Sequence, residues 1–259
     1  MIPVFQVDAF CKEIFRGNPA AVVPLDSWPA DDLLQKIASE FNLSETAFIV
    51  KTKKGYHLRW FTPVTEVRLC GHATLASAHI IFQHLDYPNP DIVFTTQAAG
   101  DLIVSKSGSA YLMDFPADKP KVFDDPKLQD IFKAEVKESY RGMDDILLIL
   151  SSEDEVLDCS PDYRKIGDLD ARALIISAPG KETDFVSRVF APACGIDEDP
   201  VTGSAHTLMT PYWSARLNKQ ELTAAQVSKR RGDLICRIQG DRVLLTGSAV
   251  TVFKGELII

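Results

Sequence analysis

Three side chains that can carry protons stand out in the sequence, and two of them lie close to glycines. Glu45 occurs in the first third of the chain, His72 directly follows Gly71, and Asp199 lies four residues before Gly203. Carboxylates and imidazoles are the groups that proteins most often use to abstract and return protons. A carboxyl group in a dry pocket becomes a stronger base, because burial raises its pKa towards neutrality. The residue types therefore predict acid–base chemistry, with Glu45, His72 and Asp199 as candidate catalytic residues.

The two glycines are expected to begin helices. A helix N-terminus exposes unpaired backbone N–H groups and carries partial positive charge, so it favours an anion. Glycine lets a ligand approach the backbone closely. Gly71, Gly203 and the following Ser204 are therefore candidate substrate-binding residues, and a carboxylate is the simplest anion for them to hold.

The elements that position these residues occur twice along the chain. Gly71 and Gly203 are separated by 132 residues, and so are the segments GDLIV, from Gly100, and GDLIC, from Gly232. Phe61-Thr62-Pro63 is echoed by Phe190-Ala191-Pro192 at a separation of 129, so the second copy carries three extra residues before its glycine. A constant offset over several elements indicates an internal duplication.

The duplication predicts two similar domains, residues 1–116 with a helix at 71–85 and residues 117–259 with a helix at 203–217. The first helix reads GHATLASAHIIFQHL, and a helix that is apolar on nearly every face belongs in a core. Strand-like segments lie on both sides of it. We therefore expect an α+β fold in which each half is a curved, mostly antiparallel sheet wrapped around a central helix. If a pseudo-twofold axis relates the halves, both helix N-termini face one interdomain cleft, where small-molecule sites tend to lie.

Composition excludes several other classes of function. The chain has 259 residues and a formal net charge of −8, which argues against nucleic acid as a partner. No apolar stretch reaches the length of a membrane span, and the N-terminus lacks the pattern of a signal peptide. Five scattered cysteines without CxxC spacing fit a reducing, cytoplasmic setting and predict no metal site.

Five segments resemble the phenazine-biosynthesis PhzF-like proteins, within the wider diaminopimelate-epimerase-like fold. They span nearly the whole chain in order: FRGNPAAV from Phe15, LSETAF from Leu43, RWFTP from Arg59, LCGHATL from Leu69 and EDPVTGSA from Glu198. The resemblance implies the two-domain fold, frequently a homodimer, and cofactor-free chemistry in which a glutamate moves a proton on a small carboxylate. The characterised family reaction isomerises a dihydro-hydroxyanthranilate, and that substrate does not transfer automatically to other members.

Carried over by position, the resemblance assigns Glu45 as general acid/base, while His72 and Asp199 orient the substrate or relay protons. Gly71 and Ser204 then line the carboxylate pocket. The segment Gly17-Asn18-Pro19 is typical of a turn, and its place beside a strand makes Asn18 a further candidate for substrate contact.

Two alternatives remain open from the sequence. Epimerases of this fold use two cysteines, one at the start of each central helix; Cys70 occupies the first position, but Pro200-Val201-Thr202 stands at the second. A Cys70-dependent amino-acid epimerase is thus one alternative, although a cysteine is by base rate a small buried residue. The other is a non-catalytic protein that keeps the cleft for binding metabolites or partners. For Asp199 itself, a purely structural role as the N-cap of the second helix also stays open.

Overall fold

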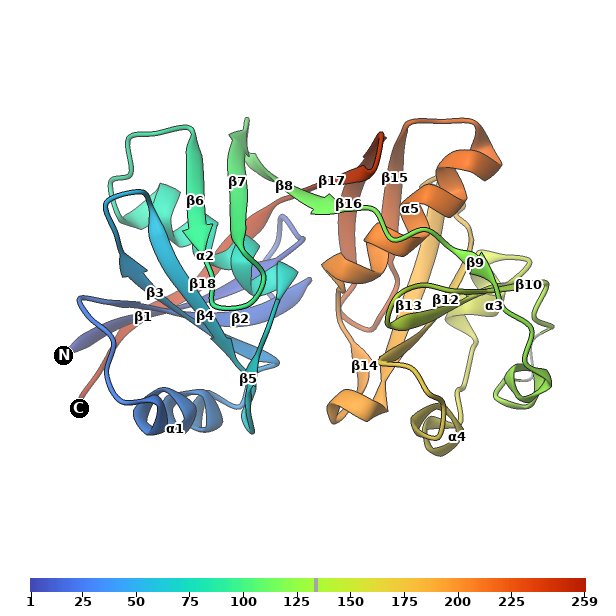
Figure 1. Ribbon diagram of the computed structural model, residues 1–259, viewed down its shortest axis with the longest axis horizontal. Helices are drawn as coiled ribbons and strands as arrows, with labels where there is room; N and C mark the ends of the chain where they lie inside the picture. Colours follow the sequence, from blue (N-terminus) through green and yellow to red (C-terminus); the bar gives the residue numbers. More distant parts are fainter. Residues whose placement is uncertain (133–134) are drawn as a thin grey trace. The chain divides into compact units, whose positions relative to one another are not determined.

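The computed structural model describes residues 1–132 and 135–259, which form two compact units (Figure 1). Unit 1 comprises Met1–Asp114 together with Thr246–Ile259, and unit 2 comprises Phe115–Leu245. The division after Asp114 falls close to the predicted boundary after residue 116. The assignment of the last segment differs, because Thr246–Ile259 belongs to unit 1 and not to the second half.

Unit 1 contains two helices and nine strands, together with the end of a tenth strand, β17. Its elements are β1 (Ile2–Ala9), β2 (Asn18–Leu25), α1 (Asp31–Phe41), β3 (Glu45–Lys51), β4 (Tyr56–Phe61), β5 (Glu66–Val67), α2 (Gly71–His84), β6 (Asp91–Thr95), β7 (Asp101–Ser107), β8 (Ala110–Pro116) and β18 (Ala249–Leu257), with the end of β17 (Arg242–Gly247). Strands β8 and β17 each carry the chain from one unit into the other.

Unit 2 has a similar succession of elements. They are β9 (Lys121–Val122), a 3₁₀ turn η1 (Pro126–Asp130), β10 (Glu138–Arg141), β11 (Asp145–Ile149), α3 (Glu153–Leu157), α4 (Tyr163–Gly167), β12 (Ala173–Pro179), β13 (Phe185–Ala191), η2 (Pro192–Cys194), β14 (Ile196–Asp199), α5 (Gly203–Leu217), β15 (Glu221–Gln226) and β16 (Gly232–Gln239), followed by β17.

Strand pairing repeats the duplication that the sequence predicts. In unit 1, β2 pairs parallel with β3, β3 antiparallel with β4, and β4 both antiparallel with β5 and parallel with β6. In unit 2, β11, β12, β13, β14 and β15 pair in the same order and with the same directions. The partner of Phe61 is Thr46 and the partner of Phe190 is Leu174, so the repeat extends to the register of single residues.

A buried helix lies at the centre of each unit. Every residue of α2 from His72 to Ile81 is buried, and α2 contacts β1, β2, β3 and β18 (Figure 1). Helix α5 packs against β11, β15 and β16. The predicted α+β class, with sheet strands around a central helix in each half, is therefore confirmed.

Helix α5 runs without interruption through Pro211. A proline has no N–H group, so it leaves the carbonyl four residues earlier without its helical donor. That carbonyl belongs to Thr207, and it accepts a hydrogen bond of 3.1 Å from the backbone N–H of Asp118. The connecting segment at the start of unit 2 thus supplies the donor that the proline removes.

An arginine–glutamate pair recurs at the same place in both units. Arg59 donates from Nε and Nη2 to the two carboxylate oxygens of Glu66, each at 2.7 Å, and Arg188 contacts Glu198 in the same forked manner at 2.7 and 2.9 Å. Seven positions separate the first pair and ten the second. The three extra residues of the second copy therefore lie between Arg188 and Glu198, where η2 is found.

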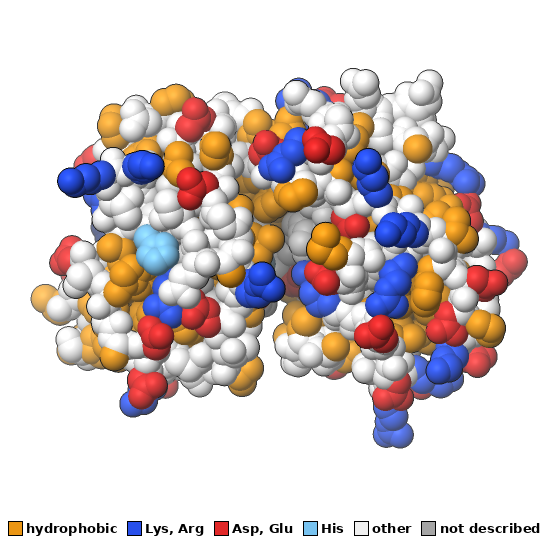
Figure 2. All heavy atoms as spheres, in the orientation of Figure 1, with side chains coloured by type: hydrophobic (Ala, Val, Ile, Leu, Met, Phe, Trp, Pro, Cys, Tyr) orange, Lys and Arg blue, Asp and Glu red, His pale blue; other side chains and the backbone are white. Residues whose placement is uncertain are grey.

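Charges of both signs are interspersed on the face of the molecule in Figure 2, where basic side chains have acidic neighbours. Ion pairs of the structure include Lys181 with Asp154 and Lys219 with Asp184. Among the described residues, no helix is long and apolar enough to cross a membrane.

Candidate active site

A carboxylate and a buried imidazole meet at the start of the central helix of unit 1. Nε2 of His72 lies 3.2 Å from Oε2 of Glu45, and the two side chains are 6% and 19% exposed. Burial lowers the pKa of His72 to about 3, so the ring is neutral at physiological pH. The contact is therefore between a carboxylate and a neutral imidazole, with the carboxylate on the more accessible side.

The other ring nitrogen of His72 faces two further side chains. Nδ2 of Asn18 lies 3.1 Å from Nδ1 of His72, and Sγ of Cys70 lies 3.5 Å from the same atom. Asn18 has no exposed surface, and Cys70 is 7% exposed. Four sequence-predicted residues, Glu45, His72, Asn18 and Cys70, thus form one connected group. Asn18 was predicted to contact the substrate, but in the structure its side-chain amide contacts Nδ1 of the His72 ring.

Backbone geometry fixes the group from several directions. Asn18 and Glu45 are the first residues of β2 and β3, two strands that pair side by side, and Cys70 is the N-cap of α2. Gly17 has φ +63°, and a Cβ there would lie 2.1 Å from the carbonyl oxygen of Ala9. Only glycine fits this position, so the turn that leads into Asn18 depends on it.

Among the residues that the structure describes, Glu45, Cys70 and His72 are also a group of side chains that could hold a metal ion. One ligand atom from each lies within 4.8 Å of the others, an arrangement that the scattered cysteines of the sequence did not predict. The thiol approaches Nδ1, whereas the carboxylate approaches Nε2. Contacts on opposite nitrogens of one ring are the pattern of a hydrogen-bonded chain, because a single ion binds a histidine through one nitrogen.

The predicted residues of the second half gather at the start of α5. Oδ2 of Asp199 accepts a 2.5 Å hydrogen bond from the hydroxyl of Thr202, and Nε2 of Gln226 donates to the backbone carbonyl of Asp199. The N-cap of α5 is Thr202, so Asp199 is not the helix cap. His206 Nδ1 contacts the carbonyl of Thr202 at 2.8 Å, and burial lowers the pKa of His206 to about 4. The neutral His206 ring therefore stabilises the first turn of α5 through its contact with the Thr202 carbonyl.

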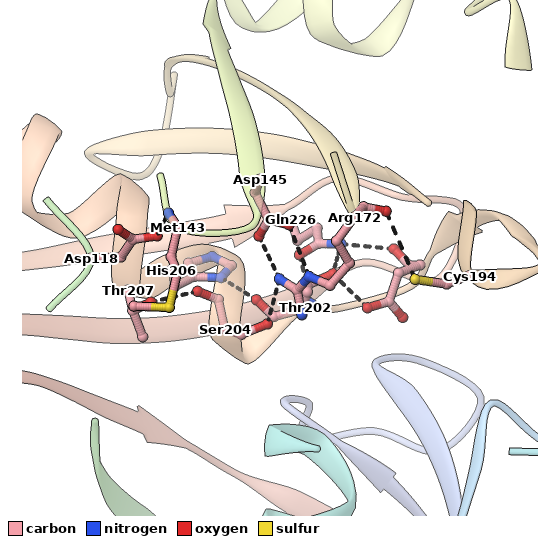
Figure 3. A network of polar contacts seen from close by, with 11 residues as sticks. Asp118, Met143, Asp145, Arg172, Cys194, Thr202, Ser204, His206, Thr207 and Gln226 are labelled. Atoms are coloured by element: carbon pink, nitrogen blue, oxygen red, sulfur yellow. Dashed lines mark hydrogen bonds and ion pairs between the residues drawn. The ribbon is translucent and has the colours of Figure 1, made fainter. Parts of the chain in front are cut away.

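Arg172 is a functional candidate that the sequence did not reveal. Its Nη2 donates to Oγ of Ser204 at 3.1 Å, and its guanidinium forms a forked pair with the buried Asp145 (Figure 3). Hydrogen bonding to Asp145 raises the pKa of Arg172 against the opposing effect of burial. A fixed cation thus stands beside the helix start at which an anion was predicted. Knowledge of the strand register identifies Arg172 as a site residue. In unit 2 it stands at the position that Ser44, the residue before Glu45, occupies in unit 1.

The predicted site residues are therefore distributed as two groups. Glu45, His72, Asn18, Cys70 and the helix-starting Gly71 belong to unit 1. A second group, made of Asp199, Gly203 and Ser204, belongs to unit 2. The interdomain position of the site stays a prediction.

A strand succession that occurs twice, each time around a central buried helix, defines the epimerase-like fold class. A solved probable proline racemase from Agrobacterium radiobacter K84 shares this fold with a TM-score of 0.64 over 100% of this chain and 93% of that one, at only 8% identity. At this level of identity, the similarity to the racemase concerns the fold alone.

Within that class, the chain belongs to the phenazine biosynthesis-like protein family, whose model matches residues 7–255. It is 47% identical to a protein of Pseudomonas aeruginosa named an uncharacterized isomerase, over 97% of both sequences. A solved PhzF-family protein from Enterococcus faecalis is 43% identical and superimposes with a TM-score of 0.97, covering 100% of this chain and 99% of that one. The predicted family is confirmed, and the protein is an enzyme of the isomerase class.

Proposed function

We propose that this protein is a cofactor-free isomerase that moves a proton on a small carboxylate-bearing metabolite, with Glu45 as the general acid and base. The observation that carries the proposal is the 3.2 Å contact between the Glu45 carboxylate and the buried, neutral His72 ring. A carboxylate that is partly accessible and rests against an uncharged imidazole can take a proton from a substrate without first breaking an ion pair.

The proposed step is a proton shift across an allylic system. The Glu45 carboxylate takes a proton from a carbon next to a double bond, and the electron pair of that C–H bond moves into the conjugated system. The protonated Glu45 then returns a proton to the far end of the system, so the double bond migrates and no other reactant is consumed. His72 stays neutral throughout and orients the carboxylate.

The remaining predicted residues take binding roles in this proposal. The backbone N–H groups at Gly71 and at Gly203 and Ser204 hold the substrate carboxylate, and Asp199 orients a polar group of the substrate. The fixed guanidinium of Arg172 beside Ser204 supports an anionic ligand at that helix start. A homodimer and a cytoplasmic location also remain predictions.

Proton NMR in deuterated water tests the acid–base assignment. The protein is incubated with a panel of small carboxylic acids that includes dihydro-hydroxyanthranilate. We expect deuterium incorporation or double-bond migration in one compound, and a fall of about 10²–10⁴-fold in that rate for Glu45→Gln, as is usual when a general base is lost. Retention of the full rate by folded Glu45→Gln would refute the role of Glu45.

The Cys70-dependent epimerase is the second candidate, and the 3.5 Å contact between Sγ of Cys70 and Nδ1 of His72 is the observation in its favour. A thiol beside an imidazole at a helix start is a common arrangement of a reactive cysteine. Cys70→Ser separates the two candidates. The proposed isomerase tolerates this substitution better than Glu45→Gln, whereas the epimerase loses its exchange activity. Binding of a panel compound without any exchange would favour the non-catalytic alternative.

A further inference from the structure

The neutral His72 ring carries one N–H proton. Which ring nitrogen carries it decides whether the Glu45 carboxylate faces a hydrogen-bond donor or an acceptor. A neutral imidazole is a donor at one nitrogen and an acceptor at the other. If Nε2 carries the proton, the ring offers an N–H group to the Glu45 carboxylate. If Nδ1 carries it, a nitrogen lone pair lies 3.2 Å from a carboxylate oxygen, and the two acceptors repel each other.

The Nε2 side does not by itself fix the proton. Although Oε2 of Glu45 is close, Nε2 makes no well-aligned hydrogen bond with the residues that the structure describes, and it is fully buried. The Nδ1 side differs, because Asn18 lies at 3.1 Å with its Nδ2, and the Cys70 thiol lies at 3.5 Å. An amide nitrogen can only donate, whereas a thiol can donate or accept weakly. Asn18 therefore favours a bare, accepting Nδ1, and the Cys70 thiol is compatible with it.

We infer that Asn18 is a positioning residue that holds His72 in the tautomer with the proton on Nε2, and so directs an N–H group towards Glu45. This inference deepens the proposed function, since it explains how a neutral histidine stabilises the carboxylate form of the base. It also changes the role predicted for Asn18 from substrate contact to support of the imidazole.

The surrounding backbone makes this control rigid. Asn18 is held in the β1–β2 ladder opposite Ala9, and Gly17 precedes it in a conformation that excludes other residues. On the other side, the hydroxyl of Thr74 donates to the carbonyl of Cys70 at 2.6 Å and closes the first turn of α2. Asn18 and His72 therefore approach each other from two fixed elements, and neither needs to be ordered by a ligand.

The opposite orientation of the Asn18 amide is disfavoured by the same chain of contacts. With Oδ1 towards the ring, Nδ1 would have to carry the proton, and the bare Nε2 would face the carboxylate. That arrangement favours the protonated form of Glu45, which must lose its proton before it can act as a base. The geometry with Nδ2 towards Nδ1 leaves Glu45 ready to accept a proton.

Imidazole ¹⁵N NMR tests the inference directly, because it reports which nitrogen is protonated and needs no substrate. The chain has five histidines, and His72→Gln assigns the signals of His72. We expect the wild-type ring to show a protonated Nε2 and a bare Nδ1 at neutral pH. A wild-type ring with the proton on Nδ1 would overturn the inference.

Two substitutions of Asn18 probe the cause. Asn18→Asp presents only acceptor oxygens, so Nδ1 becomes protonated, whether the ring is then neutral or charged. Asn18→Ala removes the donor, and we expect the Nδ1-protonated fraction to rise roughly fivefold to tenfold, the equivalent of one lost hydrogen bond. If the buried carboxylate of Asn18→Asp prevents folding, Asn18→Ala still tests the inference. An Nδ1-protonated fraction that stays at the wild-type value in the folded variants would contradict the inference.

Thr46→Val is the matched control, since Thr46 follows Glu45 in β3, is fully buried, and its hydroxyl makes no hydrogen bond with the residues that the structure describes. It should leave the tautomer unchanged even if it alters stability. Where a substrate has been found, Asn18→Ala should lower kcat about tenfold or more with a smaller change in KM, because orientation of the base matters most in the transition state. The ¹⁵N result stands apart from activity, so failure of the isomerase proposal and failure of this inference are distinguishable.

Discussion

At the scale of single residues, Gly17 has the strictest requirement in the candidate site. Its φ is +63°, and an added Cβ would lie 2.1 Å from a backbone oxygen that cannot move out of the way. We expect Gly17→Ala to lower the free energy of unfolding by about 2–4 kcal/mol, because a backbone clash is added to the cost of a left-handed conformation. Urea denaturation at 25 °C measures the change.

Gly100→Ala is the control for the conformational part of that cost. Gly100 has φ +73°, but an added Cβ there meets nothing within 4 Å. Its substitution should cost only about 1 kcal/mol. Equal losses for the two variants would show that the contact with Ala9 is relieved by a small shift of the turn, and would remove the argument that Gly17 anchors Asn18.

The residue types of the site could be predicted from sequence, but their contacts could not. Glu45 and His72 are predicted as catalytic residues from their residue types and from the family segments in which they stand. Burial of Asn18 under the imidazole depends on the pairing of β1 with β2 and on the packing of α2 across them, which no local pattern encodes. Arg172 was missed for a similar reason, since it lies 32 positions before Ser204 and only the strand register brings them together.

At the scale of elements, the repeated arginine–glutamate fork joins equivalent strands in the two units. Arg188 also donates to the backbone carbonyls of Val156 and Cys159, and its guanidinium lies 5.0 Å from the ring centre of Phe190. Lysine has no fork and fewer donors, so Arg188→Lys should destabilise unit 2 by about 1–3 kcal/mol. Arg59→Lys is the matched variant in unit 1.

The duplication makes this pair of variants informative. Each should affect hydrogen-exchange protection mainly within its own unit, because the contacts of Arg59 lie in unit 1 and those of Arg188 in unit 2. Native-state exchange followed by mass spectrometry resolves the two units. Loss of protection spread evenly over both units in either variant would mean that the forks do not act locally.

At the scale of the whole molecule, the sequence predicted the number of units but not the path of the chain. The offset of 132 residues located both central helices to within one residue of their observed ends, because a repeat is a property of local patterns. The return of Thr246–Ile259 to unit 1 rests on the pairing of β18 with β1, between strands at opposite ends of the chain. Alternation of residue types along β18 carries no information about which strand will be its neighbour.

Buried histidines give the whole molecule a characteristic dependence on pH. Burial lowers the pKa of His72 to about 3, of His79 to about 4 and of His206 to about 4. In the unfolded chain each titrates near 6.5. Below that pH the unfolded state binds more protons than the folded state, so stability is full above pH ~6.5 and is lost as the pH falls towards ~4.

The expected slope differs between the units. Unit 1 contains His72 and His79, whereas unit 2 contains His206. Each group contributes up to about 1.4 kcal/mol per pH unit, so below pH ~6 the part of the slope due to these three rings approaches about 2.7 kcal/mol per pH unit for unit 1 and half of that for unit 2. Urea denaturation between pH ~5 and 7 avoids most carboxylate titration. His206→Gln should flatten the dependence of unit 2 and leave that of unit 1. A stability independent of pH in this range would show that these rings bind protons equally in the folded and unfolded states, so that burial does not lower their pKa.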